Sequence, residues 1–254
     1  MKTSVDVILK EYDLALLEKE YERISIFVDD SKKLDSICSR INKLTEGSLA
    51  RAISSKEFET KSCGDVLTLS FPRALQAKYL DLVKWSKSIQ PNDARKAGVN
   101  LAKKSNNSKI LVCAFAQKFS DELMKSYLLR RYEFSNYKTI ENESVGSVTL
   151  MLKKPKDFKK PLFEIKAIVD GVFLTRNLVN EPANILNTVE FSDRLKELSK
   201  LGIEVEILEE KKLAELGMNA LLGVGQGSAN PSKVVVMSWK GSSKKKKPLV
   251  LVGK

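Results

Sequence analysis

The sequence predicts an α/β fold in two domains, and three features of its 254 residues lead to this prediction. Short β-branched and aliphatic runs, the pattern of strands, alternate with segments whose apolar residues recur every three or four positions, the pattern of helices. A stretch rich in lysine and proline, residues 153–161, interrupts both patterns. Hydrophobic residues make up 43% of the chain, which is enough to form buried cores.

The amino-terminal part, residues 1–152, is expected to form the first domain. Its apolar runs predict six strands, at residues 4–9, 24–28, 66–69, 79–85, 110–115 and 145–152. Three helices are predicted between them: one capped by Asp30 and Ser31, one over residues 93–103, and one capped by Ser120. Because strands and helices alternate, we expect the sheet to be largely parallel or mixed.

The carboxyl-terminal part, residues 162–254, is expected to follow a linker at 153–161 and to begin a second domain. A long helix from Phe163 should end at Glu181–Pro182, because the residue before a proline is disfavoured in the α region. A helix capped by Gly202, a strand and a short helix are predicted next, at residues 189–201, 203–207 and 209–216. Two continuous apolar runs, 234–237 and 249–252, are typical of strands covered on both faces.

Composition narrows the possible chemistry. The chain has no histidine, which excludes nucleophile triads with a histidine base and histidine zinc sites. A metal site would have to use carboxylates, carbonyls and amines, ligands that suit magnesium, manganese or zinc. Cys38, Cys63 and Cys113 have neither disulfide nor zinc spacing and are predicted to be free, mostly buried thiols.

The charge and hydropathy patterns bear on location and partners. No run of 18 apolar residues and no secretory signal is found, so we expect a cytoplasmic protein with no membrane partner. The net charge of +12 makes attraction to nucleic acid plausible. Much of the basic excess, however, lies in Lys153–Lys160 and Lys244–Lys247, two predicted connections where lysines are usually solvated.

Three segments are candidate sites, and each has a structural alternative. The glycines of Gly223–Gly227 could cradle a phosphate, or could be needed for a positive φ or for a close backbone approach beside the sheet. The polar run Asn180–Asn184 could hold a ligand, or could only stop a helix. Lys254 could be a charged chain end. It also follows an apolar strand, and parallel-sheet enzymes place their functional groups at the carboxyl ends of strands.

Segments Val172–Asn184, Leu221–Ser228 and Leu251–Lys254 resemble the leucyl aminopeptidase (cytosol aminopeptidase) family, in the same order and at similar spacing. Upstream of about residue 160 the resemblance is limited to the general layout and to Tyr132–Phe134 followed by Tyr137–Thr139. The resemblance implies a macro-like amino-terminal α/β domain, followed by the start of an α/β metallo-exopeptidase domain. It also implies that Lys254 is a ligand of one of two divalent metal ions, manganese or zinc.

By this resemblance the full enzyme would remove amino-terminal residues, leucine preferred, from peptides with a free amino terminus, and would assemble as a homo-hexamer. The family's other metal ligands lie beyond Lys254, so we expect this chain to be a fragment that lacks most of the two-metal site, binds no metal stably and is inactive alone. Some bacterial members bind DNA. The alternative function is therefore a non-catalytic DNA-binding or regulatory module. Nucleotide or ADP-ribose binding by the first domain is a third hypothesis, which lacks a glycine-rich phosphate loop after a strand.

Overall fold

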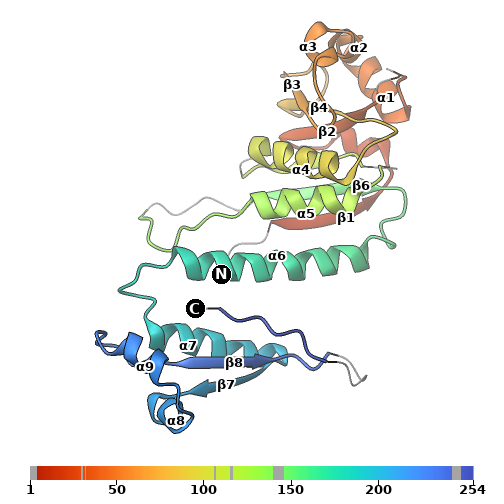
Figure 1. Ribbon diagram of the computed structural model, residues 1–254. Coiled ribbons are helices and arrows are strands. Elements are labelled where there is room, and N and C mark those ends of the chain that lie inside the picture. Colours follow the sequence, from red (N-terminus) through yellow and green to blue (C-terminus); the bar gives the residue numbers. More distant parts are fainter. Residues whose placement is uncertain are drawn as a thin grey trace. The chain divides into compact units, whose positions relative to one another are not determined.

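The computed structural model describes residues 5–29, 31, 33–105, 107–114, 117–139, 146–241 and 247–253 (Figure 1). The chain divides into two compact units, Met1–Thr175 and Arg176–Lys254. The first unit holds a six-stranded sheet and the second a two-stranded one. The mixed α/β class expected from the sequence is confirmed. The domain limits expected from the sequence, 1–152 and 162–254, stay a prediction.

The sheet of the first unit has the strand order β1-β6-β5-β2-β4-β3. All neighbouring strands run parallel except β3, which is antiparallel to β4 at the edge. The strands are β1 (Asp6–Glu11), β2 (Arg23–Val28), β3 (Val66–Ser70), β4 (Tyr79–Lys84), β5 (Ile110–Val112) and β6 (Ser147–Leu152). Each overlaps one of the six predicted runs, and the prediction of a largely parallel or mixed sheet is confirmed.

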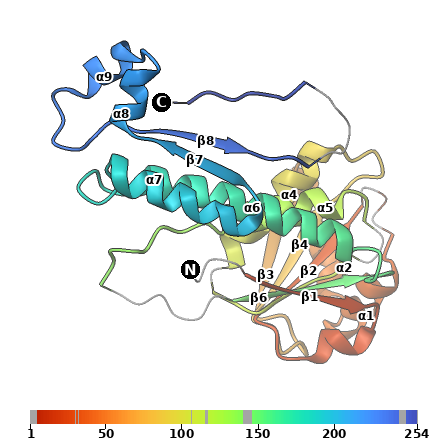
Figure 2. The same ribbon diagram turned by 90° about the horizontal axis from the view of Figure 1, so that it is seen from below.

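Helices cover this sheet on both faces, as Figure 2 shows for α1 and α2 on one side and α4 and α5 on the other. Alternate strand residues point to opposite faces, so Ile24 and Ile26 join one apolar cluster while Phe27 joins the other. The first cluster lies under η1 (Leu14–Glu18), α1 (Ser36–Leu44), α2 (Ser48–Ile53) and α3 (Lys56–Glu59). The second lies under α4 (Pro91–Ser105), α5 (Ser120–Arg130) and the first turns of α6 (Lys159–Asn180). Burial on both faces explains the continuous apolar runs of these strands.

Two predicted helix caps are wrong. The N-cap of α1 is Asp35, whose Oδ1 accepts a hydrogen bond from the Cys38 amide at 2.8 Å. Ser31 instead donates its amide to Asp29 in the preceding turn, and the other predicted cap, Asp30, lies outside the described residues. The N-cap of α5 is Phe119 in the left-handed region (φ 58°), and Ser120 is the first residue of the helix.

The second unit contains α7 (Thr188–Lys196), η2 (Glu197–Leu201), α8 (Glu210–Glu215) and α9 (Asn219–Gly225), with β7 (Glu204–Leu208) antiparallel to β8 (Val234–Ser238). The predicted helix stop before Pro182 and the Gly202 cap are confirmed. The strand at 234–237 is confirmed, but its burial is not, since Val236 and Met237 are 43% and 48% exposed. Among the described residues β7 is its only neighbour, so β8 is an edge strand there and not a central one.

The structure also bears on the predicted state of the three cysteines. Cys38, Cys63 and Cys113 are free thiols, with Cys38 and Cys113 buried and Cys63 partly exposed, as expected. Burial raises the pKa of the Cys113 thiol far above its usual value, so this group is not a nucleophile at neutral pH.

None of the helices in the described residues is long and apolar enough to cross a membrane.

A buried ion pair joins three strands of the first sheet. The guanidinium of Arg23 donates two hydrogen bonds of 2.9 Å to the Asp81 carboxylate, and Thr68 donates a third at 2.6 Å. The Arg23 side chain is 9% exposed and the Asp81 side chain 1%. The ring centroid of Tyr79 lies 4.3 Å from the guanidinium carbon. The pair therefore fixes β2, β4 and β3 to one another inside the protein.

Asp81→Asn should destabilise the first unit by about 3–5 kcal/mol, because it leaves a buried guanidinium without a counter-charge. Urea unfolding followed by circular dichroism would measure the loss. Glu46→Gln is the matched control: it breaks the Arg73–Glu46 pair, whose side chains are 74% and 63% exposed, and should cost no more than about 1 kcal/mol. Equal effects of the two substitutions would contradict a structural role for the buried pair.

Gly98 allows α4 and α5 to pack closely, since a Cβ at this position would overlap the carbonyl oxygen of Leu123. Gly98→Ala should therefore cost about 1–3 kcal/mol as the helices are forced apart. At Gly171 in α6 nothing lies within 4 Å of an added Cβ, so Gly171→Ala should stabilise its helix by up to about 1 kcal/mol. Thermal melts of the two variants should move in opposite directions. A Gly98→Ala protein that melts no lower than the parent chain would refute the close approach.

Candidate functional site

The predicted metal ligand, Lys254, lies outside the described residues. The segment before it, Leu249–Val252, has no regular secondary structure and pairs with no strand of the described chain, and its residues are 71–93% exposed. The predicted covered strand is therefore wrong for this structure. A strand needs a neighbour that forms hydrogen bonds with its backbone amide and carbonyl groups. This segment pairs with no strand in the part of the chain that is described.

The polar run Asn180–Asn184 lies where α6 ends. Its Glu181 carboxylate is almost fully buried, with a side chain 3% exposed, and accepts a hydrogen bond of 2.9 Å from Arg194 in α7. Arg194 also donates to Glu190 at 2.7 Å. The hydrogen bonds to Glu190 and then to Glu181 raise the pKa of Arg194. This supports the structural interpretation of the run, since Glu181 is used to join the helix end to α7.

The glycine segment is not the predicted loop. Gly223 and Gly225 belong to α9, and neither has a positive φ. At Gly225 a Cβ would clash with the Ser232 hydroxyl, whereas at Gly223 and Gly227 an added Cβ would meet nothing within 4 Å. The close-approach interpretation therefore applies to Gly225 alone. A phosphate-cradling loop is contradicted, because these residues continue a helix instead of preceding one.

A two-metal site cannot be assembled from the described residues. Nowhere among them do three histidine, cysteine, aspartate or glutamate side chains come close enough to hold a metal ion. The resemblance assigns a single ligand, Lys254, to this chain. No catalytic step through metal ions follows from the side chains that the structure describes.

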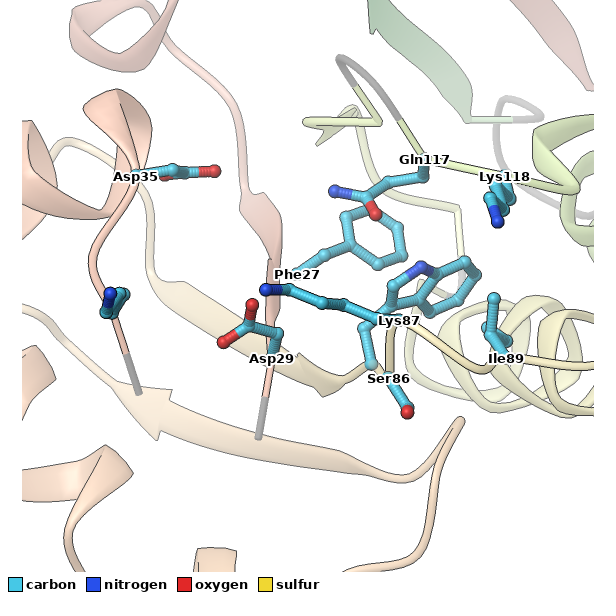
Figure 3. A pocket seen from close by; sticks show the side chains of 10 residues that line it. Phe27, Asp29, Asp35, Ser86, Lys87, Ile89, Gln117 and Lys118 are labelled. Atoms are coloured by element: carbon cyan, nitrogen blue, oxygen red, sulfur yellow. The ribbon is translucent and has the colours of Figure 1, made fainter. Parts of the chain in front are cut away.

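The first unit contains a cavity of about 350 Å³ that the sequence analysis did not identify. It opens at the carboxyl ends of β2, β4 and β5, and we call it the crevice. Phe27 of β2 and Trp85 after β4 meet edge to face on its floor, with ring centroids 4.8 Å apart. Both rings are almost fully buried, and Ile89 extends the apolar floor. Figure 3 shows Phe27 near the centre of the crevice.

The crevice lies where the sheet reverses the direction of its connections. β2 continues to α1 on one face, whereas its neighbour β5 continues to α5 on the other face. Loops that leave adjacent parallel strands toward opposite faces separate, and open α/β sheets bind ligands in the resulting cleft. The position is therefore a candidate binding site on topological grounds.

Charged side chains of both signs line the crevice: Asp29, Lys33, Asp35, Lys87 and Lys118. The backbone holds both carboxylates, since Asp29 accepts the Ser31 amide at 2.9 Å and Asp35 accepts the Cys38 amide at 2.8 Å. Within the described ranges the three lysines take part in no salt bridge. Figure 3 shows Asp35 on the side of the crevice opposite Gln117 and Lys118.

A sequence signal for the crevice existed. Asp29 comes directly after β2, Ser86 and Lys87 follow β4, and Gln117 and Lys118 follow β5. Polar residues that follow buried parallel strands gather at one edge of the sheet. The strands were predicted, but their order was not, and the order decides which of these residues meet.

Comparison with known proteins agrees with the resemblance. Residues 173–254 match the family model described as "Cytosol aminopeptidase family, catalytic domain". The chain is 40% identical over 242 residues to a probable cytosol aminopeptidase of Dinoroseobacter shibae, covering 95% of this chain and 49% of that protein.

Among solved structures, a mutant of tomato leucine aminopeptidase matches 97% of this chain and 53% of its own, with a TM-score of 0.77 and 20% identity. A manganese complex of the bottromycin maturation enzyme BotP matches 87% of this chain and 46% of its own, with a TM-score of 0.63 and 19% identity. At these identities the structures show a shared fold. The sequence matches establish that this chain, which spans about half the length of the curated relatives it matches, belongs to the cytosol aminopeptidase family.

Proposed function

We propose that this chain supplies the first domain and the beginning of the catalytic domain of a metal-dependent aminopeptidase, which releases amino-terminal residues, leucine preferred, from peptides. The observation that carries the proposal is the match of residues 173–254 to the family's catalytic domain. That range contains most of the segment that ends at Asn184 and all of the two segments that end at Ser228 and Lys254, on which the resemblance rests.

The proposal includes the domain limits 1–152, 153–161 and 162–254, with Lys254 as a metal ligand. An amine ligates a metal only as the neutral base, so Lys254 would need a pKa lowered by burial and by the cation. Two divalent ions, manganese or zinc, would polarise the scissile carbonyl and activate water. The similar BotP structure is a complex with manganese, which supports the choice of a divalent ion.

Partners and location follow from the same resemblance. A peptide with a free amino terminus is the proposed substrate, a homo-hexamer the proposed assembly and the cytoplasm the proposed location, in keeping with the relatives' description as cytosol aminopeptidases. DNA binding has the net charge of +12 as its support.

We further propose that residues 1–254 alone do not hydrolyse peptides. The described residues offer no group of three carboxylate or thiol ligands, and one lysine cannot hold two ions. The proposal is compatible with the similarity, because the chain covers 49% of a full-length relative.

The experiment compares residues 1–254 with a chimera in which they are joined to the remaining half of the Dinoroseobacter shibae relative. Release of leucine from leucine p-nitroanilide with added manganese or zinc should occur only in the chimera. Within it, Lys254→Ala should lower kcat/KM roughly a hundredfold or more, because even the outer partners of metal ligands contribute about 10–100-fold. Bound metal, measured by elemental analysis, should fall as well.

Lys247→Ala is the matched control, since Lys247 lies in the same segment and has no proposed role in metal binding. It should leave both activity and metal content unchanged. Turnover by residues 1–254 at even about a hundredth of the chimera's rate would refute the proposed inactivity, as a lost two-metal site costs many orders of magnitude. An active chimera that tolerates Lys254→Ala would refute the ligand role.

A further inference from the structure

We propose that the crevice of the first unit binds a free apolar α-amino acid. Its ammonium group would lie toward Asp29 and Asp35, its carboxylate toward Lys118, and its side chain on the apolar floor. The crevice lies outside the range that matches the catalytic-domain model, residues 173–254.

The charges favour a zwitterion over an anion. Two of the five charged side chains are carboxylates, and both are held at the rim by backbone amides 2.8–2.9 Å away. A phosphate dianion would be attracted by the lysines but repelled by these fixed carboxylates. A ligand that carries one charge of each sign matches Asp35 and Lys118, which stand on opposite sides of the crevice, while the Lys87 side chain reaches across toward Asp29 (Figure 3).

The floor favours a small apolar side chain. Phe27 and Trp85 are 6% and 5% exposed, so a ligand can reach only a small part of each and gains by covering the apolar surface that remains. A volume of about 350 Å³ is at the lower end of the range for ligand pockets, roughly 300–1,000 Å³. This size suits a single amino acid better than a dinucleotide or a folded peptide.

The ligand belongs to the class of product that the proposed function would release. That link rests on the proposed function, but the binding itself does not, because it is argued from the first unit alone. Binding can therefore be measured without any catalytic readout.

The test uses tryptophan fluorescence of residues 1–254 carrying Trp239→Phe. The chain has two tryptophans, so this substitution leaves Trp85 on the crevice floor as the only one. Titration with L-leucine should give a saturable change in emission. Leucinamide lacks the carboxylate, 4-methylpentanoate lacks the ammonium group and glycine lacks the apolar side chain, so each should bind at least about tenfold more weakly.

Two variants assign the ends of the ligand. Lys118→Gln should weaken leucine and 4-methylpentanoate at least about tenfold but leave leucinamide unchanged. Asp29→Asn should weaken leucine and leucinamide but leave 4-methylpentanoate unchanged. Asparagine retains an oxygen that can accept the Ser31 amide, so the turn should persist. The control, Lys103→Gln/Lys104→Gln in the last turn of α4, should have no effect.

Three results would overturn the proposal: no saturable response to leucine, equal binding of leucine and 4-methylpentanoate, or tighter binding of AMP than of leucine. The last would identify an organic phosphate site instead. An inactive chimera accompanied by normal leucine binding would refute the proposed function and leave the crevice assignment intact. An active chimera without a leucine response would refute the crevice assignment and leave the proposed function intact.

Discussion

The pairing of Arg23 with Asp81 is the interaction on which the sheet of the first unit depends most. It joins β2 to β4 and, through Thr68, to the edge strand β3. A buried guanidinium and carboxylate are tolerated only when both are fully hydrogen-bonded, so the pair favours the one register that aligns them. The same register places Phe27 opposite Val83, so that the ring of Phe27 meets Trp85 just beyond the end of β4. One strand, β2, thus carries the buried ion pair at its amino end and the crevice floor at its carboxyl end.

The inner strands β2, β4, β5 and β6 could be predicted because each contributes apolar side chains to both covered faces, whereas the edge strand β1 contributes to one face only. Helix caps could not be placed with the same certainty. Several residues before α1 are polar and suited to capping, and the residue that caps is the one whose oxygen reaches an unpaired amide, which is Asp35. No sequence rule predicts Phe119 as the N-cap of α5, because a large residue rarely adopts a positive φ.

In the second unit the sequence predicted which segments are apolar but not what covers them. Val234–Met237 pairs with β7, whereas the equally apolar Leu249–Val252 pairs with no described strand. A run of β-branched residues indicates a preference for extended backbone, and only a neighbouring strand converts it into a sheet. The predicted loop at the glycines 223 and 225 was wrong for a related reason. Their low helix propensity predicts a loop, yet α9 forms, and Gly225 lets Ser232 approach it closely.

The crevice could not be predicted because its residues come from loops after three different strands, and only the strand order brings them together. Its two kinds of charged group differ in freedom. The backbone holds Asp29 and Asp35, while Lys33, Lys87 and Lys118 are exposed and have long rotatable stems. Fixed groups lose little conformational entropy on binding, and mobile ones lose more. The crevice should therefore discriminate more strictly at the ammonium end of a ligand than at its carboxylate end.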